Sequence, residues 1–139
     1  RERFWQQTDL ALGLKYEVTW ARRDNRQVGI GPFVEARTAG FDVGDFGGGL
    51  VLVLPVLEAM PLWLNASGFA RVEDGVRPGG ALAATWGARS VNLHGSYGMA
   101  FGLMTEARVT ERGVDLTLGA SIDLAALALP FVILSGGFR

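Results

Sequence analysis

Apolar and polar residues alternate strictly along the segment Leu10 to Trp20, LALGLKYEVTW. Leucine, tyrosine, valine and tryptophan occupy the even positions, and alanine, glycine, lysine, glutamate and threonine occupy the odd positions. A period of two places these groups on opposite faces of an extended chain, so the pattern predicts a β-strand with one apolar face. The segments 91–110 and 113–124 repeat this alternation.

Turn-forming residues interrupt the alternation along the whole chain. They occur at residues 22–26, 42–49, 58–61, 73–80, 89–90 and 111–113. The intervals between them predict strands near residues 8–21, 27–41, 47–57, 62–72, 80–89, 91–110, 113–124 and 127–138. Eight strands joined by short turns predict a single all-β domain over residues 1–139, an eight-stranded antiparallel up-and-down β-barrel.

The charged residues indicate which solvent each face of this barrel meets. A soluble barrel carries its charges on the outside, but here the charges within the expected strands all share the face opposite the apolar one. Acidic and basic residues are nearly balanced there, so they can pair inside the narrow lumen of an eight-stranded barrel. The pattern therefore predicts a transmembrane barrel with a lumen charge network. Its members are Lys15, Glu17, Glu35, Arg37, Arg71, Arg89, Glu106, Arg108, Asp115 and Asp123, with Asp9 on the same face.

The opposite face is predicted to contact lipid. Ten steps of about 3.3 Å from Leu10 to Trp20, tilted by about 45°, give a height of roughly 23 Å, close to the apolar band of roughly 25 Å on outer-membrane barrels. The predicted lipid-facing residues are Leu10, Leu12, Leu14, Tyr16, Val18, Tyr97, Phe101, Leu116 and Leu118. Aromatic residues near the turns predict two interfacial girdles. One contains Trp20, Trp63 and Trp86, and the other contains Phe4, Trp5, Phe41, Phe46 and Phe138.

Composition narrows the function classes further. At 139 residues the chain forms one domain, and its net charge of −1 provides no basic surface for nucleic acid. Without cysteine it has neither a disulfide framework nor a thiolate metal site, and we expect no cofactor. No apolar run is long enough for a transmembrane helix, so any membrane span must consist of strands. The chain starts at Arg1 without a visible signal peptide, so we expect a mature or trimmed form.

With this pattern, the whole chain resembles the small eight-stranded outer-membrane barrels of Gram-negative bacteria. Members of that group usually end in phenylalanine, whereas here Phe138 is followed by Arg139. They also usually carry longer outer loops than the short odd-numbered turns expected here. The resemblance implies location in the bacterial outer membrane and a structural, anchoring or interaction role in an envelope assembly. Membrane lipids and other envelope proteins are the partners to expect.

His94 and Ser96 suggest an alternative, because outer-membrane lipid A deacylases are similar barrels with a His-x-Ser pair on one strand. By that resemblance His94 would be the base and Ser96 the nucleophile of a lipid-modifying hydrolase. Glu106 is a poor orienting acid, since ten residues of strand separate it from Ser96 by roughly 33 Å. The pair also faces the lumen rather than lipid. The sequence favours the absence of enzymatic activity without deciding it.

Two further features leave alternatives open. The segment Leu50 to Leu57 and the segment Pro130 to Phe138 lack a clear polar face, which predicts either an apolar layer within the lumen or contact with a partner. The glycines 47–49 predict a tight turn and strand curvature rather than a phosphate loop.

If the two faces were reversed, the chain would be a soluble lipocalin-like barrel that binds an apolar ligand in its interior.

Overall fold

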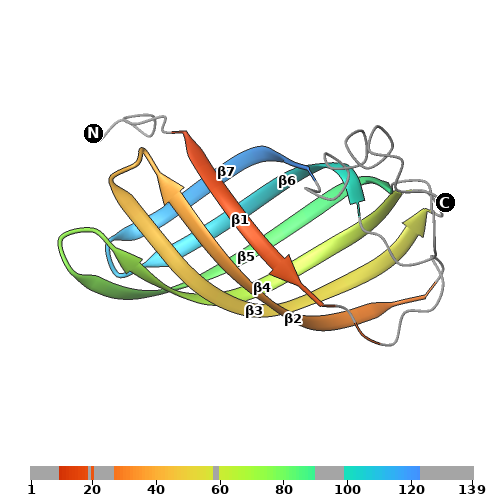
Figure 1. Ribbon diagram of the computed structural model, residues 1–139, viewed down its shortest axis with the longest axis horizontal. Coiled ribbons are helices and arrows are strands. Elements are labelled where there is room, and N and C mark those ends of the chain that lie inside the picture. Colours follow the sequence, from red (N-terminus) through yellow and green to blue (C-terminus); the bar gives the residue numbers. More distant parts are fainter. Residues whose placement is uncertain (1–9, 19, 21–26, 58–59, 90–98, 123–139) are drawn as a thin grey trace, which may run out of the picture.

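A computed structural model of the chain describes residues 10–18, 20, 27–57, 60–89 and 99–122. These residues form one antiparallel sheet of seven strands in sequential order (Figure 1). The strands are β1 (Ala11–Glu17), β2 (Gly29–Ala39), β3 (Val43–Leu57), β4 (Met60–Val72), β5 (Val76–Arg89), β6 (Met99–Thr110) and β7 (Gly113–Ile122). In this part of the chain, no helix is long and apolar enough to cross a membrane.

The sheet curves into a half-barrel, visible in Figure 1. Arg37 on β2 donates a hydrogen bond from Nη2 to Thr117 Oγ1 on β7, at 2.7 Å, although β3 to β6 separate these two strands in the sheet. The predicted all-β, antiparallel up-and-down fold is therefore confirmed. The expected eighth strand, 127–138, lies outside the described residues.

Strand register assigns the side chains to two faces. Leu14 pairs with Ala36, which in turn pairs with Phe46, and these three side chains share one face of the sheet. Lys15 pairs with Glu35 on the opposite face. On this second face, ion pairs join side chains of different strands across the hollow of the curved sheet. We therefore call the face of Leu14 the convex face and the face of Glu35 the concave face.

Two strands begin four residues earlier than the sequence pattern predicts. β3 begins at Val43 rather than residue 47, and β5 begins at Val76 rather than residue 80. Aspartate and glycine are poor strand formers, but at the start of β3 Gly44 and Asp45 pair with both β2 and β4, and this pairing overrides their propensity. The first residues of β5, Val76 to Pro78, pair with β4. The connections after β2 and β4 therefore shorten to residues 40–42 and 73–75, and the connection after β6 spans residues 111–112 as predicted. We call the end of the sheet that these three connections form the short-turn rim.

Glycines permit the close approach of β3 and β4 where the sheet curves. A Cβ atom at Gly49 would lie 1.9 Å from the carbonyl oxygen of Ala66, and one at Gly47 would lie 2.6 Å from Phe69 Cβ. A Cβ at Gly79 on β5 would lie 2.4 Å from Phe69 Cζ. The Phe69 ring thus occupies the space that Gly79 leaves, and the Cα and Cβ of Phe69 lie over Gly47. Of the two predictions for residues 47–49, curvature agrees with the structure and a tight turn is wrong.

A small apolar core lies on the concave face, farther from the short-turn rim than the charged residues. It contains Phe33, Val51, Val53 and Trp63, all buried. Val51 and Val53 come from the segment that is apolar on both faces in the sequence. Of the two explanations left open for that segment, an apolar layer inside the curve agrees with this placement.

Substitution of Gly49 by alanine tests the close approach of β3 and β4. We expect Gly49→Ala to lower the free energy of unfolding by about 1–3 kcal/mol, because the new methyl group must displace backbone. Gly68→Ala is the matched control, since its Cβ would have no neighbour nearer than 4.0 Å, and we expect a change within about 0.5 kcal/mol. Chemical denaturation followed by circular dichroism measures both. Equal effects would contradict the account of the glycines.

Candidate functional site

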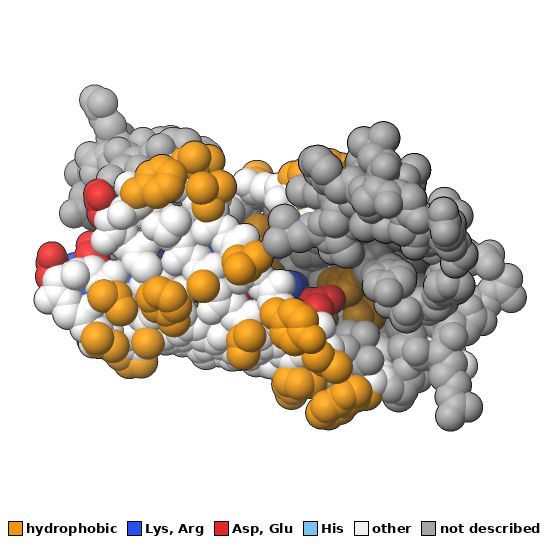
Figure 2. Space-filling model, viewed as in Figure 1, with side chains coloured by type: hydrophobic (Ala, Val, Ile, Leu, Met, Phe, Trp, Pro, Cys, Tyr) orange, Lys and Arg blue, Asp and Glu red, His pale blue; other side chains and the backbone are white. Residues whose placement is uncertain are grey.

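The convex face carries apolar side chains that no other part of the described chain covers. Among the described strand side chains, none on this face is charged. The residues predicted to face lipid lie here, and each is exposed: Leu10, Leu12, Leu14, Tyr16, Val18, Phe101, Leu116 and Leu118. Tyr97 lies outside the described residues. In Figure 2, hydrophobic side chains spread over the strands, and acidic side chains gather at the short-turn rim.

Arg108 on β6 is the centre of the concave face, with a side chain only 1% exposed. Its Nε donates to Glu106 Oε1 at 2.9 Å, and its Nη1 donates to Asp45 Oδ2 at 3.2 Å. Its Nη2 donates to Glu35 Oε1 at 2.8 Å and to Glu106 Oε2 at 3.2 Å. A guanidinium withdrawn from water needs such charged partners. Carboxylates from β2, β3 and β6 thus converge on one arginine.

Asp45 joins this arginine to a second one. Arg71 on β4 holds Asp45 in a bidentate pair, with Nε to Oδ1 at 2.8 Å and Nη2 to Oδ2 at 3.0 Å. The Nη1 of Arg71 also donates to Asp115 Oδ2 on β7 at 2.6 Å. Asp45 is 3% exposed and accepts hydrogen bonds from both arginines, so it links β3, β4 and β6.

Arg37 on β2 reaches across the hollow of the sheet. Its Nη1 donates to Glu106 on β6, and its Nη2 donates to Thr117 on β7. The Phe69 ring lies beside the network, with its centroid 4.7 Å from the Cζ of Arg108, a distance suited to a cation–π contact. These contacts connect strands that are not adjacent in the sheet and so help to hold its curvature.

Lys15 and Glu17 form a separate pair on β1, with 3.2 Å between Nζ and Oε2. The Lys15 ammonium also lies 5.3 Å from the centroid of the Phe33 ring. Arg89 is the last residue of β5, and Asp123 lies outside the described residues. The structure therefore joins Glu35, Arg37, Arg71, Glu106, Arg108 and Asp115 in one network and leaves Lys15 with Glu17.

Asp45 is a central residue of the network, although the sequence pattern predicts a turn at residues 42–49. The glycines on either side interrupt the apolar alternation and hide the start of β3. Counting back from Val51 in steps of two, through Gly49 and Gly47, does place Asp45 on the concave face. Strict parity was therefore the signal that could have identified it.

The aromatic residues only partly follow the predicted girdle. Trp20 and Trp86 are exposed, at 63% and 45%, and the Trp86 Nε1 donates to the carbonyl oxygen of Met60 at 3.1 Å. Trp63 contradicts the prediction, because it is 5% exposed and packs in the apolar core of the concave face. Trp63, Asn65 and Arg71 all occupy odd-numbered positions of β4, so their side chains lie on the concave face. Nearness to a turn in the sequence does not change this. Trp5 and Phe138 lie outside the described residues.

The structure provides no test of the candidate catalytic pair, because His94 and Ser96 also lie outside the described residues. Within those residues, no cluster of three or more histidine, cysteine or acidic side chains could hold a metal ion. The guanidinium groups of Arg37, Arg71 and Arg108 already donate to carboxylates. The described network can thus bind strands together, but its arginines are not free to receive an anionic substrate.

Comparison with known proteins adds no relative to this picture: no family model, curated protein or solved structure matches the chain. The function must therefore be inferred from the chemistry of the two faces.

Replacement of Arg108 tests whether the network holds the fold together. We expect Arg108→Leu to lower the free energy of unfolding by about 3–5 kcal/mol, because Glu35, Asp45 and Glu106 would remain buried without their shared partner. Arg112→Ala is the control, since Arg112 is 51% exposed and pairs with Glu73 at 3.1 Å on the short-turn rim. We expect it to cost at most about 1 kcal/mol. Chemical denaturation compares the two variants, and similar losses would contradict a structural role for Arg108.

Proposed function

We propose that the chain is an integral β-barrel of the bacterial outer membrane, with a structural, anchoring or interaction role in an envelope assembly. One observation carries the proposal: the described convex face is apolar and uncharged, whereas the described strands place their ion pairs on the concave face. This arrangement is the inverse of a water-soluble sheet, whose outer face carries the charges.

The extent of the apolar surface supports a lipid environment. Leu118, Leu116 and Val76 are 86%, 73% and 73% exposed, and similar residues cover the convex side of each described strand. In water a continuous apolar surface of this kind promotes association. Lipid removes this cost, because transfer of apolar side chains from water into hydrocarbon is favourable.

Strand length supports the same proposal. A tilted strand needs about 9–11 residues to cross a bilayer. β2 and β7 have 11 and 10 residues, β3 to β6 are longer at 12 to 15 residues, and the described part of β1 has 7. The turns at the short-turn rim span only residues 40–42, 73–75 and 111–112, as is typical of the periplasmic ends of such barrels. We therefore orient the short-turn rim toward the periplasm.

The proposed barrel is closed by an eighth strand over residues 127–138, which pairs with both β1 and β7. In the described sheet, β1 and β7 each have one paired neighbour. Lipid cannot satisfy the backbone groups of an open edge, so a membrane-spanning sheet must close.

A filled interior supports an anchoring role over transport. The Arg108 network occupies one level of the concave side, and the Phe33 and Trp63 cluster occupies another. Eight strands enclose a lumen only wide enough for side chains. Membrane lipids and other envelope proteins are therefore the proposed partners. The buried apolar cluster is also what a soluble lipid-binding barrel would contain, and the next experiment separates the two functions.

Arginine substitutions at two depths on β7 test which solvent the convex face meets. In phospholipid bilayers we expect Leu118→Arg, in mid-strand, to lower the free energy of unfolding by about 2–4 kcal/mol, because it places a charge in hydrocarbon. Val114→Arg is the matched control at the short-turn rim, with an expected loss of about 0–1 kcal/mol. Reversible denaturation from bilayers measures both. A soluble barrel would tolerate arginine at Leu118, so equal stability of Leu118→Arg and the wild type would refute the proposal.

A further inference from the structure

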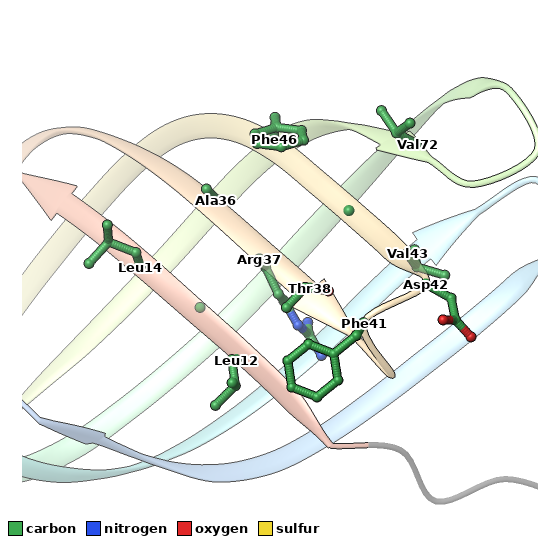
Figure 3. Close-up of a pocket in the computed structure, with 12 residues that line it drawn as sticks. Leu12, Leu14, Ala36, Arg37, Thr38, Phe41, Asp42, Val43, Phe46 and Val72 are labelled. Carbon is green, nitrogen blue, oxygen red and sulfur yellow. The ribbon is translucent and has the colours of Figure 1, made fainter.

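A groove on the convex face follows β2 to the short-turn rim (Figure 3). Its volume is about 640 Å³. The register explains its shape, because small residues on β2 lie between large ones on the adjacent strands. Ala36 pairs with Leu14 on one side and Phe46 on the other, and Thr38 pairs with Leu12. The larger side chains form the walls of the groove.

Phe41 closes the groove at the rim in an unusual backbone conformation. Its φ angle is 65°, in the left-handed region, which is strained for a bulky residue. Glycine or asparagine would fit this turn without strain. The turn itself therefore does not require phenylalanine, and the ring lines the groove while remaining 70% exposed. Strain at an exposed apolar side chain indicates a ligand contact rather than a folding requirement.

Two polar groups lie at the rim end of this otherwise apolar groove. Asp42 lines its mouth and forms no ion pair with any described residue. Thr38 places a hydroxyl group on its floor. Arg37 also lines the groove, but its guanidinium is engaged with Glu106 and Thr117 on the concave side. Asp42 and Thr38 therefore give the rim end of the groove a carboxylate, which points outward in Figure 3, and a hydroxyl group.

We infer that this groove binds one phospholipid with a primary ammonium headgroup, such as phosphatidylethanolamine. The inference rests on the proposed function, because it requires the convex face to meet lipid. One acyl chain lies along β2 between Leu14 and Phe46, and the ammonium group lies at Asp42. From Ala36 to Ala39, where β2 ends, the strand advances about 10 Å, so the groove holds the part of the acyl chain nearest the headgroup.

The headgroup preference follows from hydrogen-bond chemistry. A primary ammonium has three N–H donors for a carboxylate, whereas the trimethylammonium of choline has none. The Thr38 hydroxyl can donate to a phosphate or ester oxygen. Asp42 also repels anionic headgroups, since it adds a like charge at the mouth.

Lipid retention in detergent micelles tests the site. The folded chain is mixed with phosphatidylethanolamine or phosphatidylcholine of identical acyl chains, and native mass spectrometry counts the bound molecules. We expect one bound phosphatidylethanolamine, held about fivefold more tightly than phosphatidylcholine, as one partly exposed ion pair allows. Asp42→Asn should abolish this preference. Ala36→Trp should fill the groove and weaken both lipids about tenfold. Ala66→Trp is the matched control, because Ala66 is an exposed convex-face residue on β4 away from the groove.

Two results would overturn the site: equal affinity of the wild type for both lipids, or the same lipid affinity in Ala36→Trp as in Ala66→Trp. Circular dichroism first establishes that each variant folds in the micelles. Failure of the lipid site therefore appears in folded protein. Failure of the proposed function appears differently, as a wild-type chain that is stable and soluble without detergent.

Discussion

The burial of Arg108 is the constraint on which the rest of the structure depends. A guanidinium that is 1% exposed is stable only when carboxylates surround it. Glu35, Asp45 and Glu106 supply them from β2, β3 and β6, strands that come together only if the sheet curves. Because side chains alternate between faces, gathering the charges inside also places the apolar residues outside. Curvature, filled interior and apolar exterior are thus three consequences of one electrostatic requirement.

Glycine and one aromatic ring make this curvature possible. Gly47 and Gly49 let the backbones of β3 and β4 approach, and the Phe69 ring fills the space above Gly79. The same ring lies 4.7 Å and 5.6 Å from the guanidinium carbons of Arg108 and Arg71. Phe69 therefore connects the backbone geometry to the ion-pair network, so that packing and electrostatics favour the same curved sheet.

Period-two alternation predicts the strand order and the shared face of Glu35, Arg37, Arg71 and Arg108. It does not predict the start of β3, because Asp45 and the adjacent glycines are poor strand formers that become ordered through pairing on both sides. Nearness to a turn predicts Trp63 in an exposed girdle, but its parity on β4 places it in the buried cluster of the concave face. The groove beside Phe46 could not be predicted at all, since it depends on how the small residues of β2 align with larger ones on β1 and β3.

The central claim is that the convex face meets lipid. The most direct measurement is to fold the purified chain in detergent micelles and, in parallel, in detergent-free buffer. Heat-dependent gel mobility and β-sheet circular dichroism report folding in each medium. The account predicts a folded, heat-modifiable protein only with detergent, because the apolar side chains from Leu12 to Leu118 need an apolar solvent. A monodisperse β-protein in detergent-free buffer would contradict it.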